Sequence, residues 1–112
     1  IEMTLAMLKQ WGLSVFVEPG PLYRIPGGQR VGAGAKYADY EIEPDASAAS
    51  YFWAAAAVAG GRVTVAGLTR ESLQGDVRFV DVLTRMGCRV EECESGITVH
   101  GGPLRGIDVD MN

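Results

Sequence analysis

Asp45 and Ser47 are the residues of this 112-residue chain whose types and spacing best combine structure with chemistry. They stand at the start of the alanine-rich segment 46–59, which predicts a helix because alanine is the best helix former. The Asp45 carboxylate can accept orphan backbone N–H groups, so we favour a capping role. A helix N-terminus also attracts anions, so a place in a substrate site stays open beside capping. A carboxylate would repel a phosphate, so that role would be steering or positioning.

The other polar candidates favour structural roles. His100, the only histidine, ends a predicted strand with no cysteine or aspartate beside it, which favours a surface position. Asp108 and Asp110 alternate along another predicted strand and face the same side, and two carboxylates are too few to hold a metal. Gln74 and Arg78 begin a predicted helix and are interpreted as its polar entry. No metal or organic cofactor is expected.

Glycine-rich and cysteine motifs exclude further chemistries. Gly27-Gly28 and the segment 32–36 have the wrong spacing for a phosphate-binding loop, and no helix follows. Cys88 and Cys93 are five positions apart, so on one strand they face opposite sides and cannot bridge each other. They are too few for a zinc site, and unpaired thiols favour a cytoplasmic location.

The composition restricts the classes of molecule to which this chain could bind. The chain has 14 acidic and 10 basic residues and a net charge of −4, which argues against nucleic acid as a partner. No stretch of 18 apolar residues occurs, so no membrane span is expected. A length of 112 residues is enough for one compact domain or two small ones, and an apolar share of 47% is ordinary for a globular chain. The chain starts at Ile1 on a helix-like pattern, and we expect it to be an internal piece of a longer protein.

Hydrophobic periodicity and turn residues predict short alternating elements. Helices are expected over 1–11, 46–59 and 76–86, and a loop over 26–38. Strands are expected over 13–17, 22–25, 40–43, 62–66, 88–93, 97–100 and 107–110.

An internal repeat organises these elements. Residues 8–15 match residues 83–90 at an offset of 75, Gly27-Gly28 match Gly101-Gly102, and the strand 40–43 matches the strand 107–110. The repeat predicts an α+β fold built from a βαβαββ unit. Residues 40–102 would form one complete unit, 1–39 the tail of the preceding unit and 103–112 the first strand of the next. The parent protein would hold three or more units.

Several blocks resemble one known family. They are residues 45–52, 54–57 with Gly60-Gly61, 72–76, 78–83 and 107–112. Together they resemble the family of 5-enolpyruvylshikimate-3-phosphate synthases, in one order over nearly the whole chain, although residues 13–38 match only in layout. The resemblance implies the enolpyruvyl transferase fold, in which two domains each hold three βαβαββ units. It also implies a shikimate-pathway activity, serving chorismate and aromatic amino acid biosynthesis. That activity transfers a carboxyvinyl group from phosphoenolpyruvate to shikimate 3-phosphate.

The same resemblance implies that this chain lacks the catalytic residues. The family's aspartate lies in a Pro-Asp motif just beyond Asn112, its glutamate in a later Lys-Glu-x-Asp-Arg motif, and its phosphate-holding Ser-Ser-Gln group upstream. Asp45, Ser47 and Asn112 are the expected substrate-cleft residues. The expected partners are the two substrates and the rest of the parent chain, and the isolated chain would be inactive.

Three alternatives stay open. A UDP-N-acetylglucosamine carboxyvinyl transferase would share fold and chemistry, but its catalytic cysteine loop is not recognisable, since Cys88 and Cys93 fall in a predicted strand. An RNA 3′-terminal phosphate cyclase would need a nucleotide-binding histidine and a basic surface. A scaffold piece without enzymatic activity is the third.

Overall fold

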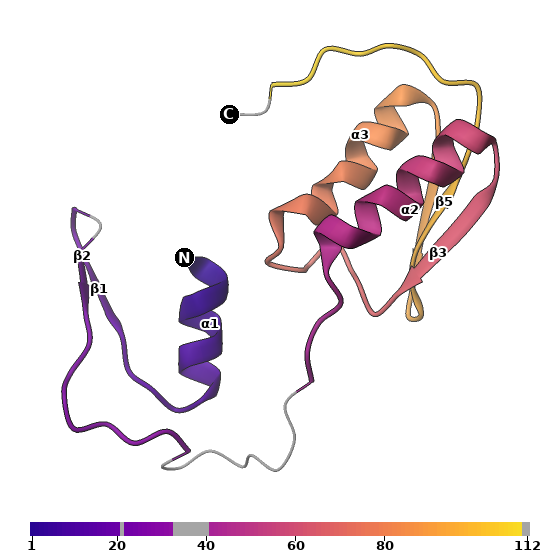
Figure 1. Ribbon diagram of the computed structural model, residues 1–112. Coiled ribbons are helices and arrows are strands. Elements are labelled where there is room, and N and C mark those ends of the chain that lie inside the picture. The colour runs from indigo at the N-terminus through magenta and orange to yellow at the C-terminus, as the bar shows by residue number, and fades with distance from the viewer. Residues whose placement is uncertain (21, 33–40, 111–112) are drawn as a thin grey trace. The chain divides into compact units, whose positions relative to one another are not determined.

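The computed structural model describes residues 1–20, 22–32 and 41–110 (Figure 1). The chain divides into two compact units, Ile1–Glu41 and Ile42–Asn112, and each is described by itself. The first contains α1 (Glu2–Gln10), β1 (Phe16–Glu18) and β2 (Leu22–Arg24). The second contains α2 (Ala46–Ala59), β3 (Arg62–Ala66), the 3₁₀ helix η1 (Gly75–Arg78), α3 (Phe79–Met86), β4 (Arg89–Cys93) and β5 (Gly96–His100). In these described ranges no helix is both long and apolar enough to cross a membrane.

The first unit shows how a glycine ends α1. Gly12 has a φ of 76°, a left-handed conformation that glycine adopts without a Cβ clash. Its N–H donates to the Lys9 carbonyl at 3.0 Å, and the Leu13 N–H donates to the Leu8 carbonyl at 2.9 Å. These two bonds form a Schellman motif, which satisfies carbonyls that have no partner within the helix.

The end of α3 repeats this motif 75 positions later. The Gly87 N–H donates to the Thr84 carbonyl at 3.1 Å, and the Cys88 N–H donates to the Leu83 carbonyl at 3.0 Å. Gly87 is also left-handed, with a φ of 116°. An antiparallel hairpin follows in both places, β1–β2 and β4–β5. The repeat found in the sequence is therefore a repeat of backbone structure as well.

The second unit is built on a three-stranded sheet of order β3-β5-β4. Both outer strands run antiparallel to β5, so they are parallel to each other. The register places Val99 of β5 between Val63 and Val90, and Thr98 between Thr64 and Glu91. Alternation along each strand thus gives the sheet one apolar and one polar face.

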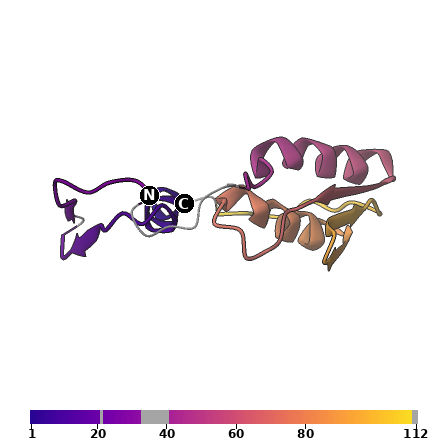
Figure 2. The same cartoon turned by 90° about the horizontal axis from the view of Figure 1, so that it is seen from below.

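Both helices of the second unit cover the apolar face, running side by side (Figure 1 and Figure 2). Trp53 of α2 is fully buried and its indole N–H donates to the Ile97 carbonyl at 3.3 Å. The other buried apolar residues are Ala46, Ala49, Ala56, Ala57, Leu68, Val77, Val80, Leu83, Cys88, Ile97 and Val99. Four of the α2 residues in this core are alanines, so α2 lies close to the sheet.

Two predicted strands are wrong within the described residues. Residues 41–43 and 107–110 form no strand, and Tyr40 lies outside the described residues. Ile107 and Val109 are half-buried while Asp108 and Asp110 are exposed, so the alternation predicted the faces correctly. A strand also needs a hydrogen-bonding neighbour, and here the Asp108 carbonyl accepts from the Arg85 guanidinium at 2.7 Å instead.

Other elements differ at their ends. The helix predicted over 76–86 begins as the 3₁₀ helix η1, and the strand predicted over 13–17 begins only at Phe16. Residues 26–32 carry no helix or strand, and the rest of the loop predicted over 26–38 lies outside the described residues. The helix over 46–59 and the strand over 62–66 have the predicted bounds.

Replacing Leu83 tests the packing of α3. Leu83 is only 3% exposed, so Leu83→Ala should lower the free energy of unfolding by about 2–5 kcal/mol, because it leaves a cavity in the core. Leu73→Ala is the control, since Leu73 is 51% exposed and its truncation should change the free energy by less than about 0.5 kcal/mol. Urea denaturation of both variants measures the difference, and equal losses would contradict the packing of α3.

Candidate functional site

The N-terminus of α2 is capped as the sequence predicts. Asp45 has an extended backbone, and its Oδ1 accepts from the N–H groups of Ser47 at 2.8 Å and Ala48 at 3.1 Å. Its carbonyl accepts the first intrahelical bond, from Ala49 at 2.9 Å. The cap therefore satisfies two N–H groups that the helix itself leaves unpaired.

A third N–H group of this end is satisfied from a distant part of the chain. Gln74 Oε1 accepts from the Ala46 N–H at 2.8 Å, and Gln74 Nε2 donates to the Pro44 carbonyl at 2.7 Å and to Glu43 Oε2 at 2.8 Å. The side-chain amide thus holds the backbone on both sides of Asp45. Sequence analysis interpreted Gln74 only as a polar helix entry, because its partners are about 30 positions away.

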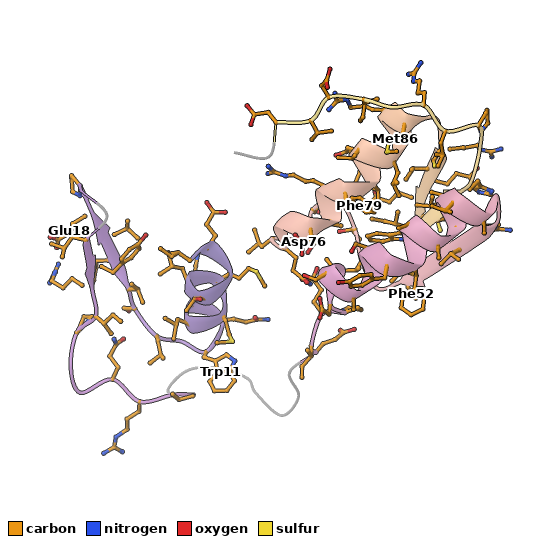
Figure 3. The ribbon with its side chains drawn as sticks, turned by 45° about the horizontal axis from the view of Figure 1, so that its top comes forward. Trp11, Glu18, Phe52, Asp76, Phe79 and Met86 are labelled. Atoms are coloured by element: carbon orange, nitrogen blue, oxygen red, sulfur yellow. The ribbon has the colours of Figure 1, made fainter. Side chains whose placement is uncertain are left out.

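Ser47 is engaged as well. Its hydroxyl donates to Asp76 Oδ2, and Asp76 lies in η1 beside the start of α2 (Figure 3). The Ser47 carbonyl accepts from the Ser50 hydroxyl at 2.7 Å. The beginnings of α2 and η1 are therefore joined by two side chains, that of Gln74 directly before η1 and that of Asp76 within it. We call residues 43–47 with Gln74 and Asp76 the α2 corner.

The α2 corner is unsuited to direct phosphate binding. Its three leading N–H groups donate to Gln74 and Asp45, so none points to an external anion. Glu43, Asp45 and Asp76 add three carboxylates, which repel a phosphate at short range. What the arrangement can do is hold Asp45 and Ser47 in fixed positions and set the local field.

The remaining predicted site residues lie apart from this corner or outside the described residues. Asn112 is one of the residues that the structure does not describe, so its place in a cleft stays a prediction. Among the residues that are described, no group of three or more histidine, cysteine, aspartate or glutamate side chains could hold a metal ion. Cys88 is buried and Cys93 is exposed, and both thiols are free.

His100 has a partner that sequence analysis missed. Its Nε2 lies 3.0 Å from Glu91 Oε2, across the β4–β5 hairpin and nine positions away. The His100 bond, followed by one from Arg89, lowers the pKa of the Glu91 carboxyl below its ordinary value. Only strand register could have revealed this pair, because it sets Glu91 diagonally across from His100.

A hollow of about 360 Å³ in the first unit is apolar rather than catalytic. Its lining is Leu5, Lys9, Leu13, Ser14, Val15, Phe16 and Val17. The repeat pairs Leu5 with Val80 and Leu13 with Cys88, and both of these partners are buried in the core of the second unit. The hollow is therefore lined in part by residues whose counterparts lie in the core of the second unit.

The helices and strands found here define an α+β protein, in which the ends of α1 and α3 and the hairpins after them are built alike. The family model of EPSP synthase (3-phosphoshikimate 1-carboxyvinyltransferase) matches residues 1–112. The chain belongs to the EPSP synthase family.

Two relatives show the extent of the similarity. The 3-phosphoshikimate 1-carboxyvinyltransferase of Shewanella oneidensis is 44% identical over 112 residues, and that of Trichormus variabilis is 48% identical over 113 residues. Each alignment covers 100% of this chain and 26% of the relative. The chain therefore spans about a quarter of the length of these relatives.

Replacing Asp45 separates its hydrogen bonds from its charge. Asp45→Ala should lower the free energy of unfolding by about 0.5–2 kcal/mol, because two N–H groups lose their acceptor. Asp45→Asn keeps an acceptor oxygen and should leave stability nearly unchanged. Thermal unfolding of the two variants measures this, and an equal loss in both would show that charge, not capping, stabilises the helix.

Glu91 predicts a defined pH dependence. A carboxyl whose pKa is lowered by folding contributes stability above its unfolded-state pKa, and that contribution is lost as pH falls through the folded-state pKa. The difference in melting temperature between the unmodified chain and Glu91→Gln should therefore be largest near neutral pH and should shrink on acidification. Glu94→Gln, in the exposed turn after β4, is the control. A difference that does not change with pH would contradict the His100–Glu91 pair.

Proposed function

We propose that this chain is an internal part of a carboxyvinyl transferase that acts on phosphoenolpyruvate and shikimate 3-phosphate in the cytoplasm. The observation that carries this proposal is the match of one family model to all 112 residues. The relatives' name gives the acceptor and the transferred carboxyvinyl group, and the family resemblance gives phosphoenolpyruvate as the donor. The two free thiols support the compartment.

The chemistry of the whole protein is an addition followed by an elimination. A base removes the proton of the shikimate 5-hydroxyl, whose oxygen bonds to C2 of phosphoenolpyruvate while an acid protonates C3. The tetrahedral intermediate then loses a proton from the new methyl group and expels inorganic phosphate, which restores the double bond. By the family resemblance, the acid and base follow Asn112, so this chain supplies no catalytic residue.

This chain contributes architecture to that reaction. In the parent protein, residues 40–102 would be a complete βαβαββ unit, 1–39 the end of the unit before it and 103–112 the start of the next. Residues 41–43 and 107–110, which form no strand here, would become strands there by pairing with the rest of the parent chain. The identical hydrogen bonds at Gly12 and Gly87 support this division. Asp45 and Ser47 would stand at the substrate cleft with Asn112, where the α2 corner holds the first two in place. No nucleic acid, membrane, metal or organic cofactor has a part in this proposal.

A chimera tests the proposal directly. Residues 1–112 replace the matching quarter of the Shewanella oneidensis relative, and phosphate release from phosphoenolpyruvate and shikimate 3-phosphate is measured. We expect a kcat/KM within about tenfold of that relative, which corresponds to about 1.4 kcal/mol of transition-state stabilisation. A folded chimera without turnover would contradict the proposal.

The isolated chain is the complementary control. It should release no phosphate from the same substrates, because the acid, the base and the phosphate-holding groups are not in it. Turnover by the isolated chain would overturn the assignment of catalytic residues to the rest of the parent protein.

A further inference from the structure

We propose that Gln74 is a positioning residue of the substrate cleft, acting through the first turn of α2. The inference rests on the proposed function. It concerns a residue to which neither the family resemblance nor the capping motif gives a role in the site.

The side-chain amide of Gln74 binds the α2 corner as a neighbouring strand would. Its oxygen accepts from the Ala46 N–H at 2.8 Å, and its nitrogen donates to the Pro44 carbonyl at 2.7 Å. A residue in a β-ladder pairs in the same way, with the carbonyl and the N–H on either side of its partner. The residue enclosed by these two bonds is Asp45, so the amide fixes the backbone that carries the capping carboxylate.

Glutamine is the residue that these contacts require. Its nitrogen has a second hydrogen, which goes to Glu43 Oε2 at 2.8 Å. Only a primary amide offers one acceptor and two donors in a plane. A glutamate at this position would lose both donors and would place a second carboxylate against Glu43. A leucine would leave the Ala46 N–H without its acceptor.

The other end of the same loop closes the corner. Residues 67–74 connect β3 to η1, and Gly67, with a φ of 76°, lies where an added Cβ would be 3.0 Å from the Pro44 ring. The loop therefore contacts the α2 corner at two points, by close packing at Gly67 and by hydrogen bonds at Gln74. Leu68, fully buried, anchors the loop in the core between these two contacts.

Asp45 and Ser47 are the residues through which Gln74 would act. Gln74 sets the direction in which α2 leaves the corner, and Asp76, two positions further on, accepts from the Ser47 hydroxyl. One short segment, Gln74–Asp76, thereby orients two of the three expected substrate-cleft side chains. Loss of the amide would change where the Asp45 carboxylate and the Ser47 hydroxyl point, while the core under α2 stays packed.

The test uses Gln74→Leu, Gln74→Glu and the control Leu73→Ala in the chimera with the Shewanella oneidensis relative. Hydrogen exchange of the Ala46 amide should rise by about tenfold or more in Gln74→Leu, because the N–H loses its acceptor. Its kcat/KM should fall about tenfold relative to Leu73→Ala, with both variants assayed well below their own melting temperatures. The ratio of kcat/KM in Gln74→Glu to that in the unmodified chimera should rise as pH falls. A protonated carboxyl can again donate a hydrogen bond to the corner.

A double substitution tests the route. If Gln74 acts through Asp45, then Gln74→Leu combined with Asp45→Asn should lower kcat/KM no more than the more damaging single change. Multiplied losses would overturn the inference, as would activity in Gln74→Leu equal to that of Leu73→Ala. An unmodified chimera that folds but has no turnover would overturn the proposed function and the inference with it, so the two failures are distinguishable.

Discussion

The close approach of α2 to the sheet is the constraint on which the second unit depends. Its buried face consists of alanines and the single Trp53, so the helix backbone nearly touches the strand ends. A Cβ added to Gly101, directly after β5, would lie 2.3 Å from the Ala56 carbonyl oxygen. That separation leaves no room for larger side chains at the contact, and the indole of Trp53 fills the space further along. The position of α2 then determines where its first turn, and so the α2 corner, can lie.

The C-terminal ends of the helices in this unit and the N-terminal end of α2 are fixed by different kinds of contact. At the C-terminal ends, left-handed glycines redirect the chain within a few residues, and these are local devices that a sequence pattern reveals. At the N-terminal end of α2, the cap is local but the Gln74 amide arrives from the loop between β3 and η1. In this unit, each α-helix therefore ends at a glycine next to it in the sequence, whereas the N-terminus of α2 also depends on a side chain from a distant loop.

The sequence predicted the elements well where their bounds depend on neighbouring residues. It predicted them poorly where they depend on contacts with a distant part of the chain. Asp45 as a cap, Gly12 and Gly87 as helix ends and the bounds of α2 and β3 are all confirmed, because each depends on backbone rules within a few residues. The strands expected over 40–43 and 107–110 are wrong within the described residues, since alternation shows which side is buried but provides no neighbour to pair with. The Gln74 amide and the His100–Glu91 pair were missed for the same reason, because both join separate elements. The Gly-Gly match is only partly structural, since an added Cβ would meet nothing within 4 Å at Gly27 but would overlap backbone at Gly101.

The segment after β5 shows what such close contacts mean for evolution. An added Cβ at Gly87 would lie 2.6 Å from the Pro103 carbonyl oxygen, and one at Gly102 would lie 2.8 Å from the Gly87 carbonyl oxygen. The two backbones therefore exclude side chains at both positions, and a single nucleotide change that replaces either glycine meets the same steric barrier. Arg105, by contrast, binds the end of α3 through its backbone N–H to the Met86 carbonyl, at 2.8 Å, as well as through its side chain. The backbone bond at Arg105 does not depend on the side chain there, whereas Gly87 and Gly102 admit no side chain. Substitutions along this segment can therefore accumulate while the path of its backbone against α3 is kept.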